Sequence, residues 1–537
     1  MTNNEQIAKL LYPILNHERL YFENKYKKRA TTGGKIITRF APNTSGNFHV
    51  GFLYIAYAAI SAARYSNGIC LLRIDDTDKK RENAKAIGNI SQTFAKLGIH
   101  FQEGFGVGGD YGPYIQSGRR EIYEAYVYDL LSRGYAYPCF CTQNDIDISK
   151  EKQLSSKVNF GYYGKWAKCR NLSYSEIKVN IDKNKPYVIR LKSFGNRKNK
   201  VEINDILLRK VRFEENDTDV ILLKSDGLPT YHFAVVVDDY LMRITHIVRS
   251  SSSFPSTPIQ LQIAEYLKIN LPQYLHLGAL TKIDHGIVRK LSRIKDPECD
   301  IGAYFELGIP SELLLLYLLS LVNRNFYDWY KLNNSNDVSS FSFVITACSP
   351  KNVLFSIDNL RKIGKEYFHN LSSIEVYSRL YEYTRQYDKN FFNIISNNKQ
   401  LTIDALDSGR YENNPRKDIS TLADFKNNYS YMYEQLYYTQ IASKTKISFD
   451  NAELVNKYIL QNYNDTCDKK KWLEDMTLFC NRNNISLKEF CFMVRNIIAG
   501  RNNTIDLFDL MKIISKKNVV KRIVFYLSKL SSRKKHK

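Results

Sequence analysis

Residues 35–78 constrain the fold more than any other part of this sequence. An apolar strand pattern over Lys35–Phe40 runs into a loop with Pro and Gly, and a helix rich in small residues begins near His49–Gly51. A second strand pattern, Ile69–Ile74, ends in an acidic cluster at Asp75–Asp78. Strand, Gly/Pro loop, helix and strand open a parallel α/β nucleotide-binding fold. In such sheets ligands bind at the carboxyl ends of the strands, where both the loop and the acidic cluster fall.

The whole chain of 537 residues is long enough for several domains. Its patterns predict four regions: a helical N-terminal extension (1–34), a Rossmann-like domain in two halves (35–103 and 220–310), an inserted domain (104–219) and an all-α region (311–537). The polar stretch Ser193–Lys200 in the insertion favours a hairpin. We expect the alternation of strands and helices to resume at Val220–Ser225.

Composition limits the class of protein further. With 44% apolar and 13% aromatic residues the chain is not typical of a disordered protein. Its longest apolar run, Leu313–Val322, is far shorter than the roughly 20 residues of a membrane span. The N-terminus lacks the pattern of a signal peptide, so we expect a cytoplasmic protein without a membrane partner.

The net charge of +23 favours a polyanionic partner. Codon bias is an equal alternative, because the chain is rich in Lys, Asn, Ile and Tyr, as an AT-rich genome would produce. The segment from Lys512 to Lys537 contains many basic residues and no acid. It would suit a nucleic-acid backbone, but an ordinary terminal helix with a solvated face would have the same pattern.

Two motifs suit a nucleotide. Gly51 allows close approach of a phosphate to a helix N-terminus, and His49 can donate to an α-phosphate. Far downstream, a basic loop containing Lys290, Ser292 and Arg293 can hold a leaving pyrophosphate electrostatically. Each motif alone is common by chance. The two in this order favour a nucleotide site over a helix start and a charged turn.

A third group of residues suits a metal. Cys139, Cys141 and Cys169 supply three thiols, whereas a tetrahedral Zn²⁺ site needs four ligands. Tyr163 is a candidate for the fourth. A structural zinc and three buried free thiols remain equal alternatives. The nine cysteines, odd in number and spread over the chain, do not indicate a disulfide framework.

The sequence around these motifs resembles bacterial-type glutamyl-tRNA synthetases, which are class I aminoacyl-tRNA synthetases. RFAPNTSGNFHVG is similar to their RFAPSPTGxxHIG, and LLRIDDTDKKR is similar to LRIEDTDxxR. KSDGLPTYHFAVVVDD and MRITHIVRSSSSFPSTPIQL also match in register, so the resemblance runs from about Lys35 to Asp296. It implies a Rossmann-like catalytic domain, an inserted acceptor-stem-binding domain and C-terminal anticodon-binding helices.

The resemblance also implies residue roles. ATP with Mg²⁺ would be held by His49, Gly51 and Lys290, with Ser292 and Arg293 on the pyrophosphate side. The amino acid would be bound by Arg39 and Arg249 at its carboxylates, by Asp75 at its amino group, and by a pocket that includes Asn43, Tyr231 and Val235. The resemblance further implies a monomer that joins L-glutamate to tRNA, with tRNA-Glu as the main acceptor. It also implies a structural Zn²⁺ in the inserted domain.

Several pocket residues differ from the family pattern. Asp75 replaces a Glu, Val235 replaces an Asn, and Ser250–Ser253 replace a Gly-acid-Glu-Trp segment. Asn43 and Arg293 also replace other residues. Each lost hydrogen-bond partner costs about 1–3 kcal/mol. The sequence therefore leaves three hypotheses: a glutamate–tRNA ligase, a paralogue for another amino acid or a non-translational acceptor, and a catalytically weak tRNA-binding protein.

Overall fold

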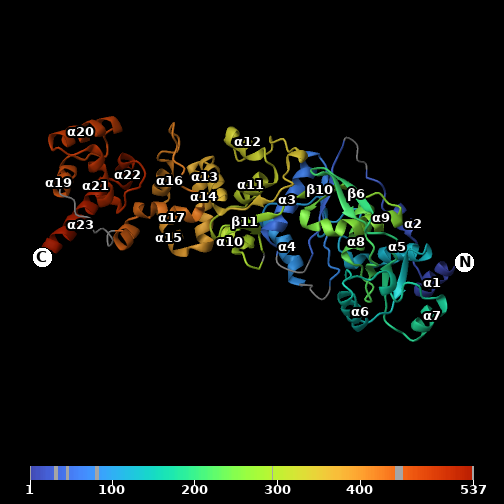
Figure 1. The fold of residues 1–537 in the computed structure, drawn as a ribbon. Coiled ribbons are helices and arrows are strands. Elements are labelled where there is room, and N and C mark those ends of the chain that lie inside the picture. Colours follow the sequence, from blue (N-terminus) through green and yellow to red (C-terminus); the bar gives the residue numbers. More distant parts are fainter. Residues whose placement is uncertain are drawn as a thin grey trace. The chain divides into compact units, whose positions relative to one another are not determined.

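The computed structural model describes residues 2–29, 34–43, 48–78, 84–292, 294–441 and 451–534. The chain forms two compact units, and Figure 1 labels their elements. The first unit comprises 1–301, 315–327 and 340–355; the second comprises 302–314, 328–339 and 356–537. Among the described residues, no helix combines the length and the apolar character that a membrane crossing requires.

A parallel sheet opens the first unit. Strands β1 (Ile37–Phe40), β2 (Ile69–Leu72) and β3 (Glu103–Gly104) are neighbours in that order. Helix α3 (Val50–Tyr65) connects β1 to β2 and packs on both. Its alanines are mostly buried, and their small side chains let the helix lie close to the sheet. The two strands and the helix predicted within residues 35–78 are confirmed, whereas residues 44–47 of the predicted loop lie outside the described residues.

The second part of the parallel fold contains β9 (His246–Ser250) and β10 (Gln273–Leu277), which pair in parallel. Helices α8 (Tyr231–Leu241) and α9 (Thr257–Leu267) pack against each other. The two parts meet where Thr245, just before β9, donates its backbone N–H to the Ile37 carbonyl at 3.0 Å. The carboxyl ends of β1, β2 and β9 therefore lie together.

The strands around residue 200 differ from the sequence prediction. Ser193–Lys200 leads from one strand to the next, and the hairpin is formed by β6 (Lys200–Asp205) and β7 (Arg209–Glu214). Strand β6 joins β10, so this hairpin extends the β9–β10 sheet. The partner of a strand is chosen by contacts distant in sequence, which local polarity does not reveal.

Strand β8 (Ile221–Leu223) also has an unexpected partner. We expected it to resume the nucleotide fold, but it pairs with β5 (Val188–Leu191), which in turn pairs with β4 (Ala136–Cys139). The chain therefore alternates between the two sheets in this region. The sheet of β4, β5 and β8 therefore includes residues beyond 219, where we expected the insertion (104–219) to end.

The N-terminal helices belong to the first unit. Helix α1 (Asn3–Leu11) packs on α5 (Arg120–Ser132), and α2 (Arg19–Lys25) packs on the same helix. Apolar residues of α1 and α2 are buried in the core that also contains α8 and α9. The remaining elements of this unit are α4 (Ala84–Lys96), α6 (Gln143–Ser155), α7 (Tyr174–Asp182), β11 (Leu280–Asp284), β12 (Ile287–Lys290) and β13 (Val353–Leu354).

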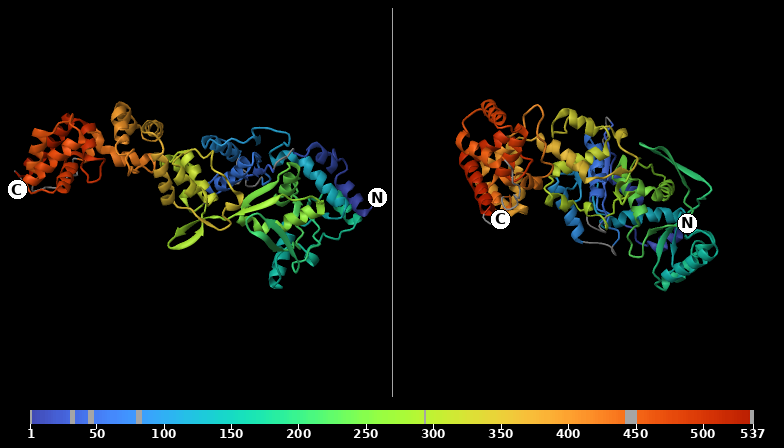
Figure 2. Two further views of the ribbon diagram at one scale, coloured as in Figure 1. Left: turned by 90° about the horizontal axis from the view of Figure 1, so that it is seen from above. Right: turned by 60° about the vertical axis from the view of Figure 1, so that its left-hand side comes forward.

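The second unit is helical, and Figure 2 shows its helices in orange and red. Its elements are α13 (Ile357–His369), α14 (Ser373–Tyr387), α15 (Lys389–Asn397), α16 (Lys399–Asp407), α17 (Leu422–Tyr429), α18 (Glu434–Leu436), α19 (Ala452–Asn462), α20 (Lys469–Arg482), α21 (Leu487–Ala499), α22 (Leu507–Ile514) and α23 (Lys516–Lys534). Helices α10 (Ile301–Glu306), α11 (Ser311–Val322) and α12 (Phe326–Asn333) contain residues of both units.

Candidate active site

A cavity of about 650 Å³ lies at the carboxyl ends of the parallel strands. It brings together most of the residues that the sequence predicted for a site: Arg39, Asn43, His49, Gly51, Asp75, Tyr231, Val235, Arg249 and Lys290. These residues come from both parts of the parallel fold and from β12. Ser292 lies outside the cavity lining, and Arg293 and the loop residues 44–47 lie outside the described residues.

His49 and Gly51 form the start of α3. His49 is the N-cap, and its Nδ1 accepts a hydrogen bond from the Gly51 backbone N–H at 3.1 Å. Because Nδ1 is the acceptor, the neutral ring carries its proton on Nε2, which is then a donor. A Cβ at Gly51 would lie 2.9 Å from Cε1 of His49. A side chain at position 51 would therefore displace the imidazole ring.

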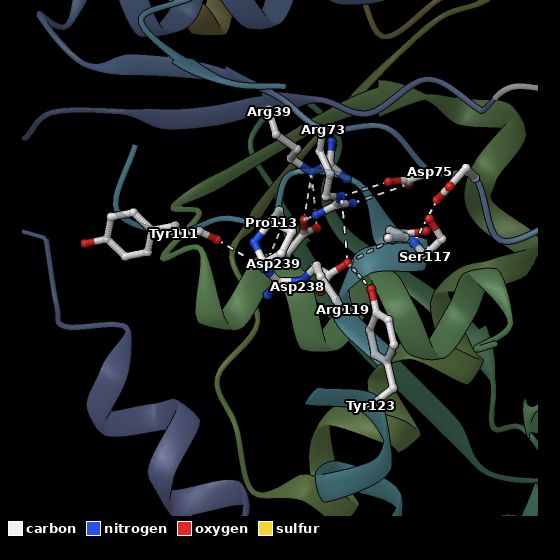
Figure 3. A network of polar contacts seen from close by, with 12 residues as sticks. Arg39, Arg73, Asp75, Tyr111, Pro113, Ser117, Arg119, Tyr123, Asp238 and Asp239 are labelled. Carbon is white, nitrogen blue, oxygen red and sulfur yellow. Dashed lines mark hydrogen bonds and ion pairs between the residues drawn. The ribbon is translucent and has the colours of Figure 1, made fainter. Parts of the chain in front are cut away.

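Two of the lining residues, Arg39 and Asp75, belong to a buried ion-pair network (Figure 3). Nε of Arg39 lies 3.1 Å from both carboxylate oxygens of Asp239. Arg73 donates to Asp239 at 2.7 Å and to Asp75 at 2.8 Å. The sequence predicted roles for Arg39 and Asp75, but it did not reveal that Asp239 holds Arg39 and that Arg73 holds Asp75.

The network continues into the core through Asp238. This carboxylate accepts hydrogen bonds from Arg119 at 2.7 Å, from Tyr123 at 2.8 Å and from Gln116 at 2.9 Å. Together with Asp75 and Asp239 it gives three carboxylates for the three guanidinium groups drawn in Figure 3. Buried charges are tolerated when they are paired and hydrogen-bonded in this way.

The acids of the network differ in pKa. Burial is the main cause that raises the pKa of Asp75 to about 6; nearby Asp238 acts in the same direction, while Arg73 opposes the shift. Burial also acts on Asp239, but Arg39 and Arg73 outweigh it and hold its pKa below the usual value. At neutral pH both carboxylates are ionised. Asp75 is the one close to titration.

Arg249 lines the cavity from the end of β9. Its Nε donates to His276 Nε2 at 2.8 Å, and its terminal nitrogens donate to Gln260 Oε1 and Thr257 Oγ1, each at 2.8 Å. Burial lowers the pKa of this arginine below its ordinary value, although a guanidinium remains charged at neutral pH. Arg249 thus faces the cavity as a cation held by neutral acceptors.

Several positions that differ from the family pattern, among them Asn43, Asp75 and Val235, line this cavity. Tyr231 begins α8 and is partly exposed, whereas Val235 is buried one turn later on the same helix. The short 3-10 helix Ser251–Ser256 contributes Ser252 and Ser253 to the lining, and Ser250 precedes them. The substituted segment therefore forms a wall of small hydroxyl side chains.

The basic loop is organised by an acid that the sequence analysis missed. Asp296 pairs with Arg289 through two hydrogen bonds at 2.7 and 2.8 Å, and accepts the Ser292 backbone N–H at 2.6 Å. Arg289 also pairs with Asp284 at 2.6 Å. The Arg289 guanidinium is thus occupied by ion pairs within the protein. Lys290, which is exposed and lines the cavity, is the cation available to a ligand.

The three predicted thiols lie together in the first unit. The Sγ atoms of Cys139, Cys141 and Cys169 all lie within 4.8 Å of one another. Hydrogen bonds from the other two thiols and from Tyr162 hold the pKa of Cys139 below its usual range, although burial opposes this shift. The cluster thus favours an anionic sulfur.

Tyr163, the predicted fourth ligand, is not the tyrosine whose hydroxyl contacts these thiols. Its hydroxyl is hydrogen-bonded to the Asn159 carbonyl at 2.6 Å. The neighbouring Tyr162 hydroxyl lies 3.3 Å from Cys139 Sγ and 3.2 Å from Cys141 Sγ. Neighbouring residues of an extended segment point to opposite sides, so a shift of one residue exchanges the side chain that faces the cluster.

Comparisons with known proteins agree with this architecture. Residues 35–337 match the model of tRNA synthetases class I (E and Q), catalytic domain, and residues 414–527 match that of an anticodon binding domain. The glutamate–tRNA ligase of Acetivibrio thermocellus is 33% identical over 97% of this chain and 99% of its own length. That of Clostridium beijerinckii is 32% identical over 98% of this chain and 99% of its own length.

A solved structure gives the same result for the fold. The crystal structure of a glutamate tRNA ligase from Elizabethkingia meningosepticum in complex with its amino acid has a TM-score of 0.75 and 23% identity, and the match covers 92% of this chain and 99% of that one. The fold and the cavity define a class I aminoacyl-tRNA synthetase. The chain belongs to the family of class I tRNA synthetases (E and Q) and is an aminoacyl-tRNA ligase. Its named relatives are glutamate–tRNA ligases. The expected Rossmann-like catalytic domain followed by a helical anticodon-binding domain is confirmed.

Proposed function

We propose that this chain is a glutamate–tRNA ligase, which activates L-glutamate with ATP and transfers it to the 3′ end of tRNA-Glu. The proposal rests on one observation: the same cavity is lined by the His49–Gly51 turn, by Lys290, and by the two buried arginines Arg39 and Arg249. A nucleotide and a dicarboxylic amino acid need these two kinds of group side by side. The printed names of the relatives support glutamate as the amino acid.

The amino-acid half of the cavity suits a substrate with two carboxylates and an ammonium group. Arg39 and Arg249 supply two guanidinium groups, whose fork of N–H donors fits carboxylates. Asp75 lines the same cavity and is ionised at neutral pH, so it suits the ammonium group. The apolar side chain of Val235 and the exposed ring of Tyr231 would then contact the aliphatic part of the substrate.

The nucleotide half suits ATP. Nδ1 of His49 accepts the Gly51 N–H, so the Nε2–H of His49 would donate to the α-phosphate, while Lys290 would stabilise the pyrophosphate. Mg²⁺ bound with ATP would neutralise part of the phosphate charge. We also propose that Ser292 and Arg293 lie on the pyrophosphate side of the bound ATP.

The reaction needs no nucleophilic side chain. A carboxylate oxygen of the amino acid forms a bond to the α-phosphorus, and pyrophosphate leaves. A ribose hydroxyl of the tRNA then forms the ester at the carbonyl carbon, and AMP leaves. The protein acts by orienting these groups and by stabilising the charge that develops on phosphate oxygens.

A structural Zn²⁺ would suit the three thiols. Cys139, Cys141 and Cys169 are at the mutual distances that one ion requires, and thiolates are preferred zinc ligands. The Tyr162 hydroxyl supplies a fourth donor on the same cluster. These residues form their own small core with Tyr137 and Ala167, so a bound ion would stabilise local structure.

ATP–pyrophosphate exchange with each of the twenty amino acids, with and without tRNA, tests the proposal. We expect exchange with glutamate in the presence of tRNA, and formation of Glu-tRNA. Exchange with a different amino acid would overturn glutamate as the substrate. Size-exclusion chromatography with light scattering tests the further proposal of a monomer, and cell fractionation tests a cytoplasmic location.

A further inference from the structure

A line of hydrogen bonds reaches Arg249 from behind, across three adjacent strands. Strands β6, β10 and β9 are neighbours in the sheet. His276 on β10 lies opposite Arg249 on β9, and Asp205 ends β6 beside β10. The distances are 2.8 Å from Arg249 Nε to His276 Nε2 and 2.8 Å from His276 Nδ1 to Asp205 Oδ2. Only Arg249 of these three lines the cavity.

The direction of each hydrogen bond follows from the chemistry of arginine. A guanidinium has donors and no acceptor, so His276 Nε2 must present its lone pair to Arg249. The proton of the neutral ring is then on Nδ1 and is donated to Asp205. Asp205 in turn accepts the backbone N–H groups of His276, Leu207 and Leu208 at 2.9 to 3.0 Å. It is therefore an acceptor on every side and fixes the tautomer of His276.

Burial makes this arrangement rigid and keeps the histidine neutral. The side chains of His276 and Asp205 are both fully buried. Burial lowers the pKa of His276, and the positive charge of Arg249 lowers it further, against the opposing effect of Asp205. The ring also lies against Phe254 at 4.4 Å and Tyr274 at 5.5 Å between ring centroids. The imidazole thus has one position and one protonation state.

The hydrogen-bond partners of Arg249 hold it without neutralising its positive charge. In the described part of the chain, its hydrogen-bond partners His276, Gln260 and Thr257 are all uncharged. Arg39, in contrast, is held by the carboxylate of Asp239. A carboxylate in place of His276 would fix Arg249 equally well but would neutralise it. The imidazole fixes its orientation and leaves its positive charge for a ligand.

We propose that His276, with its tautomer set by Asp205, is a positioning residue that aims the charged Arg249 at a carboxylate of the amino-acid substrate. This inference rests on the proposed function, in which Arg249 binds such a carboxylate. His276 and Asp205, which lie outside the cavity lining, would then help to select a carboxylic acid over the corresponding amide. Loss of the support should therefore weaken binding of glutamate far more than binding of ATP.

The test compares three variants by aminoacylation kinetics and thermal unfolding. His276→Leu removes the acceptor, and we expect its KM for glutamate to rise at least about tenfold, while the KM for ATP stays within roughly twofold. His276→Gln places an amide oxygen near the position of Nε2 and should recover most of the loss. His246→Leu removes another histidine of the same sheet, one without a contact to Arg249, and should match the wild type.

A double-mutant cycle tests the part played by Asp205. Asp205→Asn can donate to Nδ1 and so favours the wrong tautomer, and the KM for glutamate should again rise at least about tenfold. In the His276→Gln background no tautomer has to be set, so adding Asp205→Asn should change that KM by less than about threefold. An equal effect in both backgrounds would mean that Asp205 acts through the fold alone and would overturn its assignment.

The outcomes separate this inference from the proposed function. If the wild type charges tRNA with glutamate and His276→Leu leaves the glutamate KM unchanged, or raises both KM values equally, the positioning role is wrong. If the wild type activates no amino acid, the proposed function fails and the inference fails with it. A rise in the glutamate KM alone, with rescue by His276→Gln, supports both.

Discussion

The backbone N–H of Gly51 donates to Nδ1 of His49 at 3.1 Å, and this contact fixes Nε2 as the ring nitrogen that carries the proton of the neutral imidazole. We therefore expect His49→Ala to lower the rate of ATP–pyrophosphate exchange by at least about tenfold, because one donor to the α-phosphate is lost. Binding of tRNA, measured by filter retention, should persist. Gly51→Ala should lower exchange as well, since its Cβ would displace the ring. Exchange at the wild-type rate in His49→Ala would contradict the role of this turn.

Asp75 should make the KM for glutamate depend on pH. Its pKa is raised to about 6, so lowering the pH through 6 protonates the carboxylate and removes the negative charge that attracts the ammonium group. We expect the KM for glutamate to rise as the pH falls from about 7.5 to about 5.5. Asp75→Asn should have a high KM at both pH values.

Asp76→Asn is the matched control for that pH profile. Asp76 is also buried, but its carboxylate accepts the Ser117 backbone N–H and does not line the cavity. Its substitution should leave the pH dependence of the KM for glutamate in place. A flat KM profile in the wild type would show that Asp75 does not titrate in this range or does not face the substrate.

Lys290 and Arg289 are neighbours with the same charge, and we expect their substitutions to have different effects. Lys290→Ala should lower exchange by about tenfold and leave the midpoint of thermal unfolding unchanged, because this exposed side chain serves the ligand. Arg289→Ala should lower the midpoint, because it leaves the nearly buried Asp296 without its bidentate partner. The reverse pattern in differential scanning fluorimetry and exchange assays would refute this division of labour.

Asp239 should be required for stability as well as for substrate binding. Asp239→Asn leaves Arg39 and Arg73 with one fewer buried carboxylate, and breaking a buried pair costs about 3–5 kcal/mol. Urea unfolding of the first unit should show a loss of this order. The Asp239 pKa is held below its usual value, so its stabilising effect is present at neutral pH and is lost as the pH falls through that lowered pKa. A loss below about 1 kcal/mol would show that the network does not need this charge.

Tyr162 and Tyr163 provide a matched pair for the thiol cluster. We expect the purified chain to contain about one zinc per molecule by mass spectrometry of metals, and Cys141→Ser to lose it. Tyr162→Phe should weaken retention of the metal against a chelator, whereas Tyr163→Phe should not, because its hydroxyl contacts the Asn159 carbonyl. Equal retention in the two phenylalanine variants would exclude the Tyr162 hydroxyl as a ligand. Chains that purify without zinc would favour three free thiols.

The sequence by itself predicted the strand, loop and helix that carry His49 and Gly51, and the residues that meet in the cavity. These features are local or belong to motifs, because the cap His49 and Gly51 of this helix start lie within three positions. The three thiols were also recognised from their residue types and spacing.

Only the tertiary structure decided which residues hold those groups in place. Asp239, Asp205, His276 and Asp296 act across contacts of 7 to 200 residues in sequence, and a carboxylate or imidazole has no local pattern that reveals its distant partner. The same reason explains why Tyr162 contacts the thiols where Tyr163 was predicted, and why β6 and β8 have unexpected partners. Spacing identified the chemical groups, whereas burial and strand pairing determined their orientation, charge state and partners.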